Sequence, residues 1–214
     1  LVWAQSDWQN IEQQARGQTV NWFMWGGFPA ANAYVIGYVA PLLKERYDIQ
    51  INQVPVQDIA EVVSKLVVEK QAGRDRGQVD LMWINGENFC TCKKYDLLFG
   101  PFADRLPNRK FINTNHPAIL YDFGQAVDGL ESPWGSAQFV LLYDSLRTLQ
   151  PPTSIAAFLD WIRENPGRFT YPAPPDFTGS VFIRHLFYFI AGTDKNKQYD
   201  YDKRDFGKSA SQTL

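Results

Sequence analysis

The stretch TVNWFMWGG, residues 19–27, decides the fold class of this chain. Up to Trp25 it is rich in β-branched and aromatic residues, and the pair Gly26-Gly27 then ends the run. This composition predicts a buried β-strand over residues 19–25, followed by a loop. Beyond the loop, apolar residues recur at helical spacing from Ile36 to Leu43, which predicts a helix that Pro41 kinks.

Two more strands follow along the chain. Isoleucines alternate with polar residues from Asp48 onward, and Pro55 is expected to end this strand after Val54. Residues 79–84 read VDLMWI and predict a third strand, which Asn85-Gly86 ends.

A helix is predicted between the second and third strands. Apolar residues at positions 59, 62, 63, 66 and 67 form one stripe, Asp58 and Glu61 fit a capping box, and Gly73 follows as a terminator. Alternating strands and helices predict right-handed crossovers and a parallel sheet.

In a parallel α/β sheet the ligand crevice lies beyond the carboxyl ends of the strands. The predicted strands place three segments there: Trp25-Gly26-Gly27, Val54-Pro55-Val56 and Asn85-Gly86-Glu87-Asn88. This edge is therefore the candidate binding site.

The second half of the chain begins a new unit after Glu131–Gly135, which we interpret as a crossing point. Residues 137–143 and 168–171 predict strands. Pro151–Ser154 predicts one helix start, and residues 178–180 predict another.

Composition excludes several classes of protein. The chain has 214 residues, a net charge of −2 and 45% hydrophobic residues, which fits one large domain or two lobes. The near-neutral charge argues against a nucleic-acid binder. Nucleophile-elbow, zinc-protease, P-loop and dinucleotide-binding motifs are absent from the sequence, so we do not expect an enzyme.

No metal or cofactor is expected. The only cysteines, Cys90 and Cys92, are predicted to be free thiols because a bridge between residues two apart would be strained. Together with His116 and His185 they match no zinc-finger spacing, and both histidines are expected to have structural roles.

The start of the chain resembles a processed signal region. Val2-Trp3-Ala4 fits the small-residue pattern of a signal-peptidase site. The uncharged stretch from Gly17 to Leu43 contains glycines, prolines and asparagine, so it is not expected to span a membrane.

The order of motifs resembles the periplasmic solute-binding proteins of ABC transporters, and more narrowly their YnjB-like branch. The motifs that support this resemblance run through nearly the whole chain: Trp22-Phe-Met-Trp25-Gly-Gly, Val79–Phe89, Gly100-Pro-Phe-Ala, Leu106-Pro-Asn, Glu131-Ser-Pro-Trp-Gly135, Pro151-Pro-Thr-Ser and Tyr171–Ser180.

The resemblance implies a two-lobed α/β receptor of the type II periplasmic-binding-protein fold. Lobe one is expected over residues 1–130, with a hinge crossing and a partial lobe two over residues 131–214. Relatives are longer, so the second lobe is expected to be incomplete. The implied function is capture of a small polar organic solute in an inter-lobe cleft, and delivery to a membrane permease. A periplasmic monomer is expected.

Three tryptophans are candidate ligand contacts. Trp25, Trp83 and Trp134 each lie where a strand is predicted to meet a loop, and their rings could hold a planar or cationic group. Core packing is the alternative for each. Glu87 and Glu131 stand beside these rings and favour a cation such as a thiamine-like solute, with a solvated loop carboxylate or a helix N-terminal charge as the alternative.

Main-chain groups supply the remaining candidates. Gly26-Gly27 would allow close approach of a ligand, unless they only make a turn, and Asn85-Gly86 are candidates because they follow a predicted strand. Thr178-Gly179-Ser180 could bind an anion at a helix start, unless Thr or Ser only caps that helix. Two other functions stay open: a secreted hydrolase that uses two carboxylates, and an interaction module with an exposed apolar patch.

Overall fold

A computed structural model describes residues 5–74, 76–135, 139–174 and 176–192. The chain divides into two compact units, Leu1–Pro133 (unit 1) and Trp134–Leu214 (unit 2). In unit 1 the elements are α1 (Gln5–Ala15), β1 (Thr19–Trp25), α2 (Pro29–Tyr34), η1 (Val35–Val39), α3 (Ala40–Tyr47), β2 (Gln50–Val56), α4 (Ile59–Gln71), β3 (Leu81–Met82), α5 (Gly86–Lys94), η2 (Ala103–Arg105), η3 (Pro107–Phe111), α6 (Pro117–Leu120), β4 (Tyr121–Asp122) and β5 (Gln125–Ala126). In unit 2 they are α7 (Ile155–Glu164) and α8 (Phe177–Ile190).

The main sheet is parallel, as the sequence predicts, with strand order β2-β1-β3. The strand predicted at 19–25 is confirmed as β1. The third strand is shorter than predicted, but Asp80 N donates to Asn21 O at 3.2 Å and Trp83 N donates to Phe23 O at 2.9 Å. Contact with β1 therefore extends one residue beyond each end of β3.

Strand β2 does not end before Pro55, which corrects the sequence prediction. It runs through Pro55 to Val56, and Met24 of β1 pairs with Pro55. Within the described sheet β2 is an edge strand, where a residue without an N–H is tolerated.

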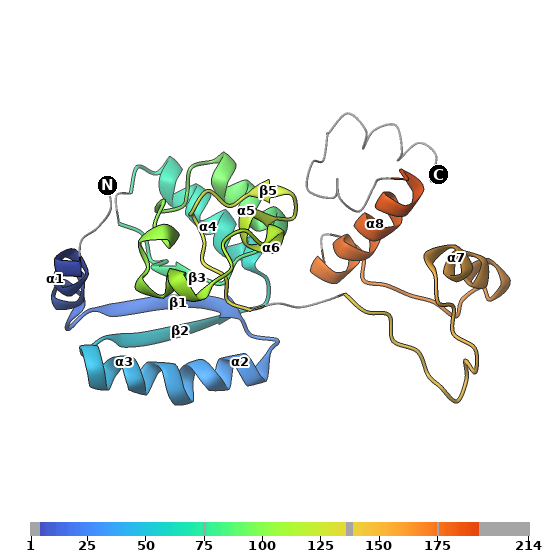
Figure 1. Ribbon diagram of the computed structural model, residues 1–214, viewed down its shortest axis with the longest axis horizontal. Helices are drawn as coiled ribbons and strands as arrows, with labels where there is room; N and C mark the ends of the chain where they lie inside the picture. The colour runs from blue at the N-terminus through green and yellow to red at the C-terminus, as the bar shows by residue number, and fades with distance from the viewer. Residues whose placement is uncertain (1–4, 75, 136–138, 175, 193–214) are drawn as a thin grey trace. The chain divides into compact units, whose positions relative to one another are not determined.

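Helices lie on both faces of this sheet, with α2 and α3 on one face and α4 and α5 on the other (Figure 1). Two small cores result. One contains Trp22, Met24, Ala31 and Val35, and the other contains Ile59, Val63 and Cys92. Burying these apolar side chains stabilises both layers.

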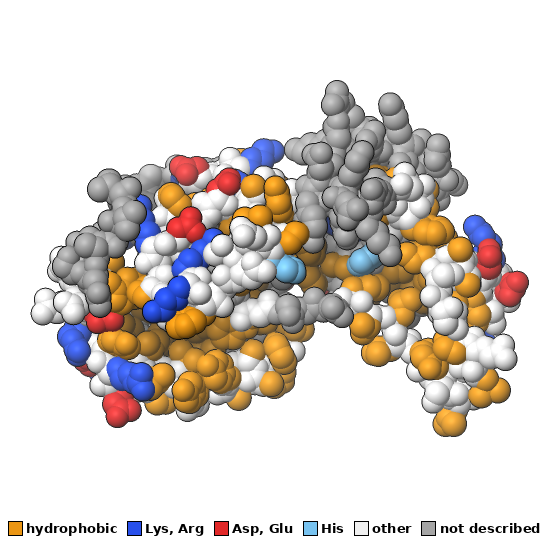
Figure 2. Space-filling model, viewed as in Figure 1, with side chains coloured by type: hydrophobic (Ala, Val, Ile, Leu, Met, Phe, Trp, Pro, Cys, Tyr) orange, Lys and Arg blue, Asp and Glu red, His pale blue; other side chains and the backbone are white. Residues whose placement is uncertain are grey.

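The helix after Gly27 contains a π-helical turn, η1, and Pro41 lies in the first turn of α3, which follows directly. Ala40 N donates to Val35 O, five residues back. The wider turn changes which side chains face the sheet. Val35 is fully buried, whereas Ile36 is 60% exposed. Figure 2 shows hydrophobic side chains exposed over this helix.

Helix α4 forms as the sequence predicts. The Asp58 carboxylate accepts a hydrogen bond from Ala60 N at 2.9 Å and caps the first turn. Val62 and Val63 are buried, and Gly73 follows the last turn with φ of 65°. Among the described residues, no helix has both the length and the apolar character needed to cross a membrane.

Unit 2 packs its two helices through aromatic rings. Ser154 caps α7 by accepting from Ala157 N at 3.2 Å, which confirms the predicted helix start. Phe158 of α7 meets Phe169 edge-to-face with ring centroids 4.9 Å apart, and Phe182 of α8 lies 5.3 Å from Phe169.

The two strands predicted for unit 2 are absent from the residues that the structure describes there. Residues 139–143 and 168–171 are not in strands, and positions 137 and 138 lie outside the described part. Leu142 is 92% exposed. A strand needs a neighbour for its hydrogen bonds, and none is formed by the described residues of unit 2.

Helix α8 is capped by Asp176, one residue before the helix. Its carboxylate accepts from Gly179 N at 3.0 Å. Replacing Asp176 with alanine is therefore expected to lower the free energy of unfolding by about 1 kcal/mol, because the cap is lost. Thr178→Ala is the matched control and should change it by less than about 0.5 kcal/mol. Urea unfolding of both variants checks this, and an equal loss in the two would contradict the assignment.

Candidate functional site

The carboxyl edge of the main sheet is shaped by the loop after β1. Gly26 N donates to Val56 O at 2.8 Å, which ties this loop to the end of β2. A Cβ on Gly27 would lie 2.3 Å from an indole carbon of Trp25, so glycine is needed for the ring to fold over the loop. At the predicted site, Gly27 thus has a packing role and Gly26 forms a backbone hydrogen bond.

Asn32, in the first turns after this loop, holds the loop in place. Its side-chain amide donates to three carbonyl oxygens: Trp25 O at 3.2 Å, Gly26 O at 3.2 Å and Phe28 O at 2.9 Å. Its oxygen accepts from Gln53 Nε2 of β2. Sequence reasoning missed Asn32, whose only signal is an amide within a long uncharged stretch.

Two aromatic rings are exposed at this edge. Trp25 is 46% exposed and Phe28, which sequence reasoning also missed, is 44% exposed. Trp83 behaves differently, because it packs against the core that includes Val35 while its ring centroid lies 6.3 Å from that of Phe28. Core packing therefore accounts for much of the Trp83 side chain. The exposed ring faces at this edge belong to Trp25 and Phe28.

The third segment of the site begins a helix where the sequence predicted a loop. Asn85 precedes α5 and makes no capping hydrogen bond through its side chain. Gly86 has φ of 58° and donates its N–H to the Asp122 carboxylate of β4. A Cβ there would lie 2.9 Å from the Phe123 ring. Glu87 is exposed in the first turn of α5, which fits the alternative that this residue is a helix N-terminal charge.

Glu131 is brought to the same region through Asp122. Burial raises the pKa of the Glu131 carboxyl to about 8, and the negative charge of Asp122 adds to this rise. Sequence reasoning identified Glu131 but missed Asp122, because their proximity depends on the β4–β5 hairpin.

A cavity of about 250 Å³ adjoins Glu131. Its wall includes Asp104 and Asp128, and both are paired: Asp104 contacts Arg109 at 2.8 Å, and Asp128 contacts Lys93. Their charges are thereby largely offset. Glu131 also lines this cavity, and its neighbour Asp122 completes the group of acids around it.

The remaining candidates lie in unit 2. Trp134 is exposed. At the start of α8, the N–H of Gly179 is already used by Asp176, and a Cβ on Gly179 would lie 1.9 Å from Pro172 O. Close packing and a capping carboxylate account for this glycine, while Thr178 is exposed and Ser180 is half-buried.

The cysteines are free thiols, and each histidine makes a local contact. Cys90 is exposed and Cys92 is buried, both as free thiols, and burial raises the pKa of Cys92 to about 11. His116 Nδ1 accepts from Ala118 N at 3.2 Å, and His185 stacks on Phe139. Within the described ranges, no group of three or more His, Cys, Asp or Glu side chains is placed to hold a metal ion.

Comparison with known proteins agrees with this architecture. A family described as "Bacterial extracellular solute-binding protein" matches residues 37–212. Protein YnjB of Escherichia coli (strain K12) is 43% identical over 182 residues, which cover 85% of this chain and 46% of that relative. The chain thus spans about half the length of this curated relative. It belongs to the bacterial extracellular solute-binding proteins, a family located outside the cytoplasm.

Proposed function

We propose that this chain forms part of the receptor of an ABC importer and captures a small organic cation, such as a thiamine-like compound, at the carboxyl edge of unit 1. In the complete protein the receptor would deliver this solute to a membrane permease. The observation that supports a cation is the neighbouring pair of carboxyl groups on Glu131 and Asp122: the charge of Asp122 helps to keep Glu131 protonated, and a cation bound beside both would favour the ionised form of Glu131.

Aromatic rings at the same edge support the organic part of the proposal. The exposed faces of Trp25 and Phe28 can bind a cation through their ring electrons, or stack on a flat ring. The Asn32 contacts fix the backbone of this loop, so less conformational freedom is lost when a solute binds.

Titration calorimetry with thiamine and choline tests the proposal, with glucose and citrate as neutral and anionic controls. We expect one cation per chain and no binding of the controls. Trp25→Ala should weaken cation binding about tenfold, because a cation–aromatic contact is lost. Phe99→Ala, which removes another exposed aromatic ring, is the matched control and should bind like the parent.

The same titration distinguishes this proposal from the two alternatives, a hydrolase and an interaction module. A hydrolase would convert the bound compound, and Glu87→Gln or Glu131→Gln would abolish conversion more than binding. An interaction module would bind none of the solutes. Either result, or equal binding by the Trp25→Ala variant and the parent, would contradict the proposal.

A further inference from the structure

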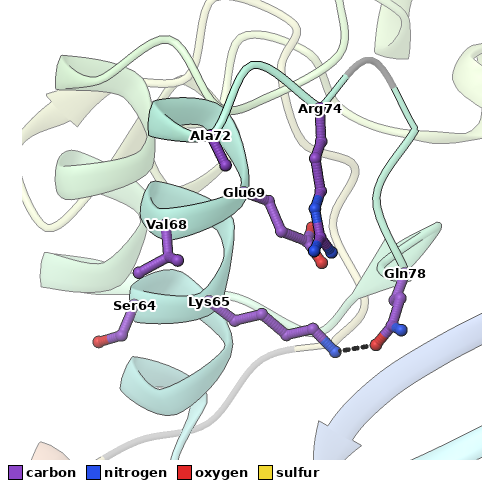
Figure 3. A pocket seen from close by; sticks show the side chains of 7 residues that line it. All are labelled: Ser64, Lys65, Val68, Glu69, Ala72, Arg74 and Gln78. Carbon is purple, nitrogen blue, oxygen red and sulfur yellow. Dashed lines mark hydrogen bonds between the residues drawn. The ribbon is translucent and has the colours of Figure 1, made fainter.

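A second cavity, of about 380 Å³, lies beside α4 (Figure 3). Because α4 leads from the carboxyl end of β2 to the amino end of β3, its last turns and the loop after it lie toward the amino edge of the sheet. The cavity thus extends from the middle of α4 toward the amino edge. Its wall consists of Ser64, Lys65, Val68, Glu69, Ala72, Arg74 and Gln78.

A buried carboxylate forms part of this wall. Glu69 lies seven residues after Val62, on the same side of α4, and is only 7% exposed. Its Oε2 atom has no hydrogen-bond partner among the described residues. A buried carboxylate without a partner costs free energy, and a positively charged donor would offset that cost.

The loop over this carboxylate is shaped to approach it closely. A Cβ on Gly77 would lie 2.6 Å from Glu69 Oε2, so any other residue would displace the carboxylate or the loop. Gly77 therefore leaves room for Glu69 in its buried position at the wall.

Two basic side chains line the same cavity. The Lys65 ammonium donates to Gln78 Oε1 and lies 5.4 Å from the centroid of the Phe23 ring. Figure 3 shows the Arg74 side chain extending toward the Glu69 carboxylate and the Lys65 ammonium pointing toward Gln78. Val68 and Ala72 supply apolar wall between these charges.

We propose that this amino-edge cavity is a second binding site, for a small zwitterion that carries a protonated amine and a carboxylate. The amine pairs with Glu69, and the carboxylate pairs with Lys65 and Arg74. The volume lies at the lower end of the range for small-molecule sites.

Alanine is a suitable probe, with ethylammonium and propionate as analogues that each lack one of its charged groups. Titrations are followed by the backbone amide NMR signals of the full chain. Alanine should shift the signals of residues 68–72 and Gly77–Gln78 in a saturable way. Each analogue should bind about tenfold more weakly or worse, because one charge-assisted contact is lost.

Variants test which residues bind the probe. Glu69→Gln keeps the size of the side chain and should weaken alanine binding about tenfold, whereas Glu61→Gln, which changes an exposed side chain in the first turn of α4, should not. The Lys65→Met variant should bind alanine with an affinity closer to that of the parent for ethylammonium, because the partner of the alanine carboxylate is lost. This variant tests the site without altering Glu69.

Three results would overturn the proposal. They are no saturable shift with alanine, equal binding of alanine and ethylammonium to the parent chain, or shifts confined to the carboxyl edge around Trp25. The last result would place the zwitterion in the other site, and the first would leave the cavity to water.

Discussion

The parent chain is expected to lose stability as pH rises, and replacing Glu131 with glutamine is expected to remove most of this loss. The pKa of this carboxyl rises from 4.5 to about 8 in the folded chain, chiefly through burial. Between these values the folded chain holds a proton that the unfolded chain has lost, so the free energy of unfolding falls as pH rises. Because the carboxyl is partly exposed, we expect a loss of about 1–2 kcal/mol, well below the full linkage value.

Urea unfolding between about pH 5 and pH 9 measures this effect. Glutamine stays neutral throughout, so the Glu131→Gln variant should be the more stable protein at the alkaline end and close to the parent at the acidic end. Glu61→Gln, an exposed glutamate in the first turn of α4, should follow the parent at every pH. Parallel pH profiles for the parent and Glu131→Gln would show that Glu131 ionises normally.

Asn32→Ala is expected to lower both stability and solute affinity. The change removes the donor to three loop carbonyls and the acceptor for Gln53. Leaving partly buried polar groups without partners should cost about 2 kcal/mol of unfolding free energy. Without this support the loop under Trp25 loses its fixed shape, and cation binding should weaken about tenfold.

Asn52→Ala is the matched control for this prediction. Asn52 Nδ2 donates to Asn21 Oδ1 at 2.9 Å on the exposed side of β2, away from the loop. Its loss should change stability by about 0.5 kcal/mol and leave binding unchanged. If Asn32→Ala binds choline as tightly as Asn52→Ala does, the loop does not contribute to the site.

Local sequence patterns predicted much of unit 1. Strand β1 and helix α4 form where composition, capping and periodicity agree, and the parallel order follows from their alternation. The predicted end of β2 at Pro55 was wrong because a general rule about proline does not apply at a sheet edge. The π-helical turn after Gly27 was not predicted, because a single wider turn is not visible as a periodicity.

Tertiary contacts explain most of what the sequence could not predict. The hydrogen bond from Gly86 N to the Asp122 carboxylate joins residues 36 positions apart, and no local sequence pattern predicts it. Asn32 became visible only through its contacts with the loop. The apolar run at 139–143 has the composition of a strand, yet strand formation depends on a neighbour rather than on composition alone. At α8, Asp176 rather than Thr178 or Ser180 became the cap.

Native mass spectrometry of the purified chain tests the central claim most directly, because it detects a bound solute by its mass, whatever its identity. We predict one small organic cation bound per chain, released unchanged on denaturation, and displaced more readily from Trp25→Ala and Asn32→Ala than from Phe99→Ala. A bare chain that also fails to bind added thiamine or choline would contradict the account. So would a bound compound that is anionic or that leaves the protein as a cleaved product.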